Sequence, residues 1–188
     1  MRITGGDLGG RALVAPRDAR VRPTSDKVRQ AIFNILRHAG FAPALNGSRV
    51  LDLFAGTGAL GIEALSHGAS FCLFVDDHAE SRALIRENVE ALGLTGVSKI
   101  WRRDATKLGD MAAGAGGPFD LVFLDPPYRK GLIAPALTGL RVGGWLADAA
   151  LVVAETAEDE IIPPTDKFLL LDTRVYGDTA VRFCRIEP

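Results

Sequence analysis

The chain is poor in cysteine and has no long apolar run. Its 188 residues include two cysteines, Cys72 and Cys184, each inside a short apolar stretch. This excludes a disulfide framework of the secreted kind and predicts buried thiols in a reducing cytoplasm. No stretch approaches the roughly 18 uninterrupted apolar residues of a membrane-spanning helix, and the first ten residues lack the apolar core of a signal peptide. Neither secretion nor membrane insertion is expected.

The chain also carries almost no net charge. Its 22 basic and 23 acidic residues give −1, which excludes a uniformly basic nucleic-acid coat. The charge is nevertheless uneven, because residues 1–29 hold six arginines, one lysine and three aspartates, and the remaining 159 residues carry a net −5. A basic segment on a weakly acidic body predicts a polyanionic partner at the N-terminal end, with a solvated surface as the alternative.

Short apolar runs alternate with amphipathic segments from residue 49 onward. Runs rich in Val, Leu and Phe predict four buried strands, at 49–55, 70–76, 119–125 and 150–156. Segments with helical spacing lie between and before them. Such alternation is typical of a mostly parallel sheet covered by helices on both faces, and the length predicts a single domain.

Local signals predict the remaining elements. Helices are expected over Ala59–Ser66, over Glu80–Leu92, and from Thr24 or Ser25 through Ala39. The C-terminal end is expected to form an antiparallel hairpin and the N-terminal end a small hairpin carrying two arginines. The C-terminal hairpin would pair Phe168–Val175 with Thr179–Ile186. The N-terminal hairpin would cover residues 1–15 and carry Arg2 and Arg11.

A glycine-rich turn follows the first predicted strand. Gly56, Gly58 and Gly61 have G-x-G-x-x-G spacing, which lets the backbone turn tightly beside a ligand at a helix N-terminus. Asp76 ends the next strand 20 residues after Gly56, where a dinucleotide-binding fold places its ribose-binding acid. Asp52 favours S-adenosylmethionine over NAD, because its carboxylate would attract the cationic methionine end and repel a pyrophosphate.

The tetrapeptide Asp125-Pro126-Pro127-Tyr128 follows the third predicted strand. A plain turn is one interpretation. The other is an amine methyltransferase site, because the Asp125 carboxylate and the Pro126 carbonyl can accept hydrogen bonds from an exocyclic amine. Tyr128 would stack on a planar base. This chemistry needs no metal, and the three histidines show no metal-ligand spacing.

Six segments of the chain read MRITGGDLGGRAL, RPTSDKVRQAIFNIL, LDLFAGTGALGIEALSHGA, LIRENV, FDLVFLDPPY and YGDT. Together they resemble one known family, the RsmD family of 16S ribosomal RNA guanine-N2 methyltransferases. The resemblance implies a class I S-adenosylmethionine-dependent methyltransferase (Rossmann-like) α/β fold. Residues 1–40 would be an N-terminal extension packed on a methyltransferase domain, 41–188. A cytoplasmic monomer is expected, with 16S rRNA in the small subunit or an assembly intermediate as its partner.

The resemblance also implies roles for individual residues. Catalytic roles fall on Asp125, Pro126, Pro127 and Tyr128. Cofactor binding falls on Asp52, Phe54, Gly56, Gly58, Asp76, Asp104, Ala105, Arg22 and Thr24, and RNA binding on Arg2, Arg11, Arg22 and Arg29. After Asp76 the family usually has a basic and an acidic residue, whereas this chain has Asp77 and His78. Asp76 and Asp77 therefore both remain candidates for the ribose.

Other functions remain open from the sequence. Adenine-N6 methylation of nucleic acid and glutamine methylation of a protein use related tetrapeptides, although the arginine-rich N-terminal segment disfavours a protein substrate. A non-catalytic RNA-binding or assembly module is disfavoured by the intact tetrapeptide. A nicotinamide oxidoreductase would be stabilised by NAD instead of S-adenosylmethionine.

Overall fold

The computed structural model describes residues 1–16, 25–162 and 167–186. In chain order its helices and strands are α1 (Asp26–His38), β1 (Arg49–Leu53), α2 (Ala59–Ser66), β2 (Phe71–Val75), α3 (Ala79–Ala91), η1 (Thr95–Val97), β3 (Ser98–Trp101), η2 (Ala113–Ala115), β4 (Phe119–Leu124), α4 (Ile133–Val142), β5 (Leu146–Ala157), β6 (Phe168–Tyr176) and β7 (Thr179–Ile186). Within these ranges, none of the helices combines the length and apolarity needed to cross a bilayer.

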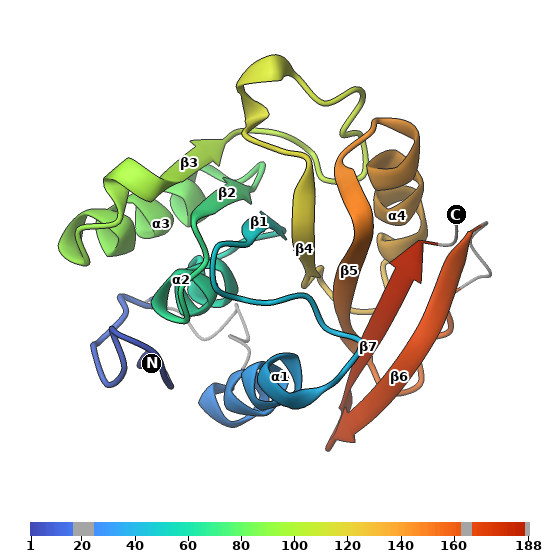
Figure 1. Ribbon diagram of the computed structural model, residues 1–188, viewed down its shortest axis with the longest axis horizontal. Helices are drawn as coiled ribbons and strands as arrows, with labels where there is room; N and C mark the ends of the chain where they lie inside the picture. The colour runs from blue at the N-terminus through green and yellow to red at the C-terminus, as the bar shows by residue number, and fades with distance from the viewer. Residues whose placement is uncertain (17–24, 163–166, 187–188) are drawn as a thin grey trace.

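In the described part of the chain, seven strands form one sheet in the order β3-β2-β1-β4-β5-β7-β6. Figure 1 shows the sheet running from β3 on the left to β6 on the right. Neighbouring strands from β3 to β5 are parallel, and β7 is antiparallel to both β5 and β6. The mostly parallel sheet and the C-terminal antiparallel hairpin are both confirmed.

Successive residues of each strand contribute to two apolar layers, one on each face of the sheet. Phe74 and Phe123 belong to the layer that also contains the buried residues of α1, α2 and α3. Val75 and Leu124 belong to the opposite layer, together with α4 and Trp145. Because both faces are covered, the central strands are apolar apart from single residues such as Asp52 in β1 and Asp120 in β4, which is why they were recognisable as short apolar runs.

The predicted helices differ little from the observed ones, but β3, α4 and the two short 3-10 helices η1 and η2 were not predicted. Ser25 caps α1, since its side chain accepts a hydrogen bond from the Val28 N–H at 3.2 Å. The strand β3 has four residues, all at least partly exposed, so it lacks the apolar run of its neighbours. Pro135 and Gly139 weaken the helical signal of α4, although proline is tolerated in a first helical turn.

The N-terminal residues pack against the body of the protein. The hairpin predicted over residues 1–15 is reduced to one antiparallel bridge, between Arg2 and Ala12. Ile3 and Leu13 are buried in the apolar layer shared with α1. The division into residues 1–40 and 41–188 stays a prediction.

Arg29 is a buried, ion-paired residue in this fold, and this burial argues against the predicted contact with RNA. Its side chain is fully buried, with Nε 3.0 Å from Oε2 of the equally buried Glu63. The same guanidinium binds Asp26 at 2.8 Å and the Arg2 carbonyl. Glu63 also accepts hydrogen bonds from the N–H groups of Thr4 and Gly5. This buried network joins α1, α2 and the N-terminal segment.

Candidate functional site

A cavity of about 690 Å³ opens where the parallel strands end. It lies at the carboxyl ends of β1, β2 and β4 and beside the loop that follows β3. The strand order reverses between β1 and β4, which is where ligands bind in open α/β sheets. Nine residues predicted from the sequence line this cavity: Asp52, Phe54, Asp76, Asp104, Ala105, Asp125, Pro126, Pro127 and Tyr128.

The glycine turn has the backbone shape that its sequence predicts. Gly56 and Gly58 have positive φ angles of 57° and 78°, which L side chains rarely adopt. Gly58 then caps α2. A Cβ atom on Gly61 would lie 2.4 Å from Cε1 of Phe74, so this glycine lets α2 lie close to the sheet. Neither Gly56 nor Gly58 lines the cavity itself; they shape the turn from which Phe54 and Thr57 reach it.

Asp52 is an almost fully buried carboxyl group at the base of this turn. It is 1% exposed, and its Oδ2 accepts a hydrogen bond from the Gly61 N–H at 2.9 Å. Burial raises the pKa of Asp52 to about 8, with a smaller upward contribution from the charge of Asp76, while the Gly61 bond lowers it. The site therefore holds a carboxyl group whose charge a cationic ligand would stabilise.

We expect Asp52 to make the ligand-free protein less stable as the pH rises from about 4 to about 8. The folded protein keeps a proton that the unfolded chain loses near its ordinary pKa of 3.8, so unfolding becomes more favourable across that window. Asp52→Asn should remove this pH dependence. The free energy of unfolding of the variant, minus that of the parent, should therefore rise by at least about 1 kcal/mol from pH 5.5 to pH 8, since one pKa unit equals about 1.4 kcal/mol.

Urea unfolding of both proteins at the two pH values measures this difference. The matched control is Asp110→Asn, at an exposed aspartate, which should shift stability equally at both values. An Asp52→Asn effect that is the same at pH 5.5 and pH 8 would contradict the account.

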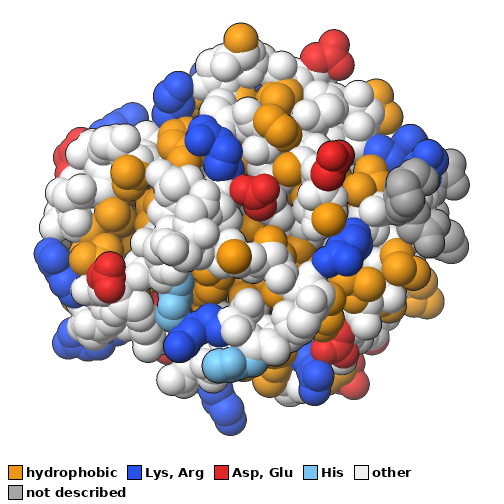
Figure 2. Space-filling model, viewed as in Figure 1, with side chains coloured by type: hydrophobic (Ala, Val, Ile, Leu, Met, Phe, Trp, Pro, Cys, Tyr) orange, Lys and Arg blue, Asp and Glu red, His pale blue; other side chains and the backbone are white. Residues whose placement is uncertain are grey.

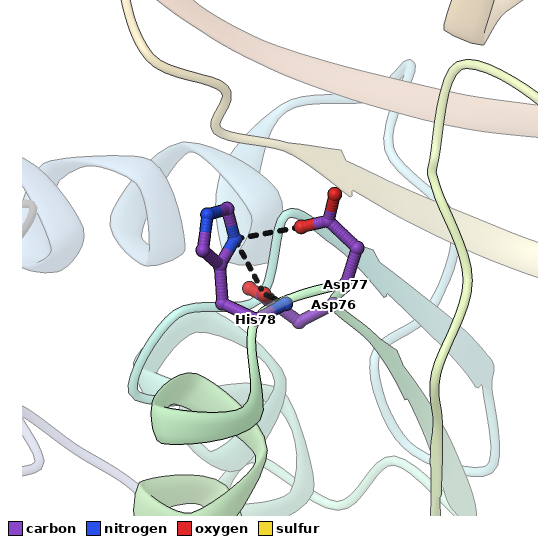
Figure 3. A group of neighbouring side chains, drawn as sticks. All are labelled: Asp76, Asp77 and His78. Carbon is purple, nitrogen blue, oxygen red and sulfur yellow. Dashed lines mark hydrogen bonds and ion pairs between the residues drawn. The ribbon is translucent and has the colours of Figure 1, made fainter.

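Asp76 and Asp77 differ in how firmly they are held. The two carboxylate oxygens of Asp76 accept hydrogen bonds from the N–H groups of Gly56 and His78, both at 2.9 Å. Figure 3 shows the His78 ring facing both carboxylates, with Nδ1 2.6 Å from Asp77 and 3.4 Å from Asp76. The Asp76 side chain is 8% exposed and that of Asp77 57%. Asp76 is thus tied to the glycine turn, whereas Asp77 also lines the cavity but is mostly exposed.

These three side chains are also close enough to share a metal ion. Their ligand atoms lie within 4.8 Å of one another. Asp76 already accepts two backbone hydrogen bonds, and Asp77 and His78 are mostly exposed. We assign no metal to this group.

The loop after β3 supplies a third group of cavity residues. Asp104 accepts hydrogen bonds from the hydroxyl and the N–H of Thr106, at 2.6 and 2.9 Å, and these hold its pKa below the ordinary value. Ala105 is buried beside it. The sequence interpretation missed Arg103, which lines the cavity, donates to the Leu108 carbonyl at 2.6 Å and lies over the ring of Trp101. Its position beside Asp104 in the sequence was the available signal.

The tetrapeptide forms the fourth part of the cavity wall. Asp125 is partly buried, and its N–H points to the Leu53 carbonyl at 3.5 Å. Tyr128 lines the cavity, and its hydroxyl donates to Oε1 of Glu155 at 2.5 Å. Burial, and then the bond to Glu155, raise the pKa of Tyr128, so it stays a hydrogen-bond donor. The sequence interpretation missed Glu155, although an acid inside an apolar strand was a signal.

Asn88 connects the N-terminal segment to the glycine turn. This side chain on α3 is 1% exposed. It accepts from the Val14 N–H at 2.7 Å and donates to the carbonyls of Val14 and Thr57 at 3.1 and 3.0 Å. Pro16, two residues further along, lines the cavity. The N-terminal segment therefore contributes to the wall of the site.

Of the residues predicted to bind RNA, those that the structure describes, Arg2, Arg11 and Arg29, do not line this cavity. The Arg2 and Arg11 side chains are exposed, and their guanidinium groups donate hydrogen bonds to the carbonyls of Gly10 and Ala91. Arg22 and Thr24 lie outside the described residues. On the face drawn in Figure 2, basic and acidic side chains are interspersed and do not form one continuous basic area.

Known proteins share this sequence pattern and fold. Residues 1–185 match the family model described as Conserved hypothetical protein 95. Ribosomal RNA small subunit methyltransferase D of Escherichia coli (strain K12) is 36% identical over 189 residues, which cover 100% of this chain and 90% of that protein. The solved structure of yhhF from Escherichia coli matches with a TM-score of 0.83 at 31% identity, over 100% of this chain and 98% of that one. SMU.776, complexed with SAH, shares the fold with a TM-score of 0.60 at 20% identity, over 88% of this chain and 50% of that one.

Proposed function

Because the chain belongs to the family described as Conserved hypothetical protein 95, the RsmD family, we propose that it methylates the exocyclic N2 amine of a guanine in 16S ribosomal RNA. The methyl donor is S-adenosylmethionine. Ribosomal RNA as the substrate class is supported by the name of the Escherichia coli relative, and guanine N2 by the resemblance of the motifs. One observation carries the proposal: the tetrapeptide Asp125–Tyr128 lines the same cavity as Asp52 and Asp76.

The fold is that of class I S-adenosylmethionine-dependent methyltransferases, and the cavity residues fit this cofactor. S-adenosylmethionine supplies a methyl group already activated on a cationic sulfur. The buried carboxyl group of Asp52 suits the cationic methionine end, and Asp76 suits a ribose hydroxyl. A pyrophosphate would instead meet the Asp52 carboxylate at close range, which disfavours a nicotinamide dinucleotide.

The tetrapeptide is suited to the amine that receives the methyl group. The Asp125 carboxylate and the Pro126 carbonyl can each accept one N–H of an exocyclic amine, which draws the nitrogen toward a tetrahedral shape and aims its lone pair. Tyr128 offers its ring for stacking on the base. The nitrogen gains the methyl carbon as the carbon–sulfur bond breaks, and it then releases one proton. These residues would contribute to catalysis by aligning the amine with the methyl group and by electrostatic stabilisation.

We expect Asp76→Asn to weaken S-adenosylmethionine binding by about 1–3 kcal/mol, because a buried ribose hydroxyl would lose its charged acceptor. Asp77→Asn is the matched control and should change the dissociation constant less than about twofold. Calorimetric titration measures both. The reverse ranking, with only Asp77→Asn weakening the cofactor, would transfer the role to Asp77.

We expect Arg2 and Arg11 to contribute phosphate contacts. Each guanidinium has five N–H donors, so the hydrogen bond that each makes to a carbonyl of the described residues leaves capacity for a phosphate. Replacing both by alanine should reduce the slope of log K against log salt for RNA binding by about 0.7–0.9 per lost contact. Arg174→Ala, at an exposed arginine on β6 paired with Asp172, is the control. Identical slopes in all three proteins would show that the two arginines are only solvated.

Analysis of rRNA from cells tests the substrate directly. Nucleoside mass spectrometry of 16S rRNA from cells that lack the gene should show the loss of one N2-methylguanosine, restored by the parent gene and not by Asp125→Ala. A cytoplasmic site of action follows from this substrate. Unchanged 16S rRNA would contradict the proposal.

A further inference from the structure

Tyr128 lines the cavity, and its hydroxyl is bound to side chains of two strands of the sheet. The hydroxyl donates its one proton to Oε1 of Glu155 at 2.5 Å and lies 3.0 Å from Oγ1 of Thr179. Because that proton is already committed to Glu155, the Thr179 hydroxyl is the donor in the second bond. The phenolic oxygen is thus used inside the protein, and the ring is what Tyr128 presents to a ligand.

The two partners of this hydroxyl are themselves fixed in the sheet. Glu155 is on β5 and is 6% exposed, and Thr179 begins β7 and is 3% exposed. These strands are paired antiparallel, with Glu155 opposite Val181 and Ala157 opposite Thr179. Tyr128 therefore has its hydroxyl bound by two adjacent strands of a rigid sheet.

The backbone after Tyr128 is held by the same end of β5. Arg129 has a positive φ of 58°, and its N–H donates to Oε2 of Glu160 at 2.9 Å. Its guanidinium pairs with Asp159 at 2.7 Å. The tetrapeptide is thus connected through a side chain and through the backbone to β5 and the residues that follow it.

We propose that Glu155, supported by Thr179, is a positioning residue that fixes the ring of Tyr128 for stacking on the target base. This inference rests on the proposed function, because it gives the ring a base to stack on. Glu155 acts through Tyr128 and does not itself line the cavity. Its acceptor atom sets the direction of the ring, and a misplaced reactant or catalytic group lowers the rate of a reaction that depends on alignment.

Three variants separate positioning from a general structural role. Glu155→Gln keeps an oxygen that can accept from the Tyr128 hydroxyl, Glu155→Leu removes the acceptor at similar size, and Tyr128→Phe removes the donor. We expect Glu155→Gln to stay within about threefold of the parent in kcat/KM for small ribosomal subunits, and Glu155→Leu to fall by about tenfold to 100-fold. The dissociation constant of S-adenosylmethionine should stay within about twofold in both.

The decisive comparison adds Glu155→Leu to Tyr128→Phe. If Glu155 acts through the phenolic hydroxyl, the second substitution should lower kcat/KM by less than about twofold once that hydroxyl is gone. An equal loss in both backgrounds would overturn the proposal, as would parent-like kcat/KM in Glu155→Leu. The melting temperatures of all variants show whether a loss of kcat/KM comes from unfolding.

A second readout does not depend on RNA methylation. The chain has two tyrosines, Tyr128 and Tyr176, so protein labelled with ¹³C-tyrosine gives two sets of ring signals, assigned by replacing each with phenylalanine. Glu155→Leu should shift or broaden the Tyr128 signals and leave those of Tyr176 unchanged, and unchanged Tyr128 signals would overturn the proposal. If the parent methylates no RNA, the proposed function fails, and the Tyr128 signals still decide whether Glu155 holds the ring.

Discussion

Replacing Asp125 by alanine is expected to lower the rate of methyl transfer by at least about 100-fold, while the affinity for S-adenosylmethionine stays within about threefold. In the proposed function the carboxylate acts on the amine of the acceptor base, and removing one preorganised hydrogen-bonding group at a reaction centre typically costs about 100- to 1000-fold in kcat. Asp125 follows β4, whereas Asp52 is in β1 and Asp76, proposed to bind the cofactor, follows β2, so the loss should fall on the chemical step.

Single-turnover kinetics and calorimetry measure the two quantities separately. Asp125→Asn is the matched variant, because it keeps the size and one acceptor but loses the charge, and it should retain more activity than Asp125→Ala. Loss of S-adenosylmethionine binding in Asp125→Ala would instead place Asp125 in the cofactor site and contradict its role at the amine.

Removing either member of the buried Arg29–Glu63 pair is expected to destabilise the protein by about 3–5 kcal/mol. Both side chains are fully buried, so truncating one leaves the other charged and without this partner in an apolar interior. Loss of Glu63 also removes the acceptor for the Thr4 and Gly5 N–H groups. For a chain of this size the melting temperature should fall by roughly 6–20 °C.

Thermal or urea unfolding of Arg29→Ala and Glu63→Ala measures this cost. The matched control is Asp26→Asn, which removes the half-exposed partner of Arg29 and should cost less than about 1 kcal/mol. The double variant should be less destabilised than the sum of the single ones, since both remove the same interaction. A cost below about 1 kcal/mol for Glu63→Ala would contradict the network and reopen an exposed role for Arg29.

The elements that the sequence predicted best are those whose pattern is set by burial. The runs at β1, β2, β4 and β5 are continuous because both faces of the sheet are covered. The strand β3 was missed because it is short and partly exposed, and α4 because its Pro135 and Gly139 are typical of loops. The spacing of apolar residues shows which face of a helix or strand is buried. A short edge strand has too few buried residues for such a pattern to be recognised.

The residues of the candidate site were predictable where a sequence motif determines the backbone conformation. The glycine turn and the tetrapeptide place Asp52 and Asp125 at neighbouring strand ends, so their meeting in one cavity follows from a parallel sheet. Contacts between segments far apart in the sequence were not predictable. Glu155 lies 27 residues from Tyr128, and Asn88 lies 74 residues from Val14.

Arg29 is a side chain whose burial the sequence did not reveal. Its position in a basic segment favoured a phosphate contact. The charge pattern gave no indication that this side chain is buried in an ion pair with Glu63, 34 residues later. The net charge of a segment is the sum over its side chains and does not show which of them face solvent.

The choice of base is the central claim, and the tetrapeptide alone does not decide it. Asp125 and the Pro126 carbonyl can accept from the amine of guanine or of adenine, and Tyr128 can stack on either. Guanine presents an N1–H donor beside its amine where adenine presents an acceptor, so a second acceptor in the pocket would favour guanine by about 1–3 kcal/mol.

Incubation of the protein with methyl-labelled S-adenosylmethionine and small ribosomal subunits that lack the modification, followed by digestion to nucleosides, measures the product. We predict label in N2-methylguanosine, and none when Asp125→Ala replaces the parent. Label in N6-methyladenosine, or none in N2-methylguanosine, would contradict the account.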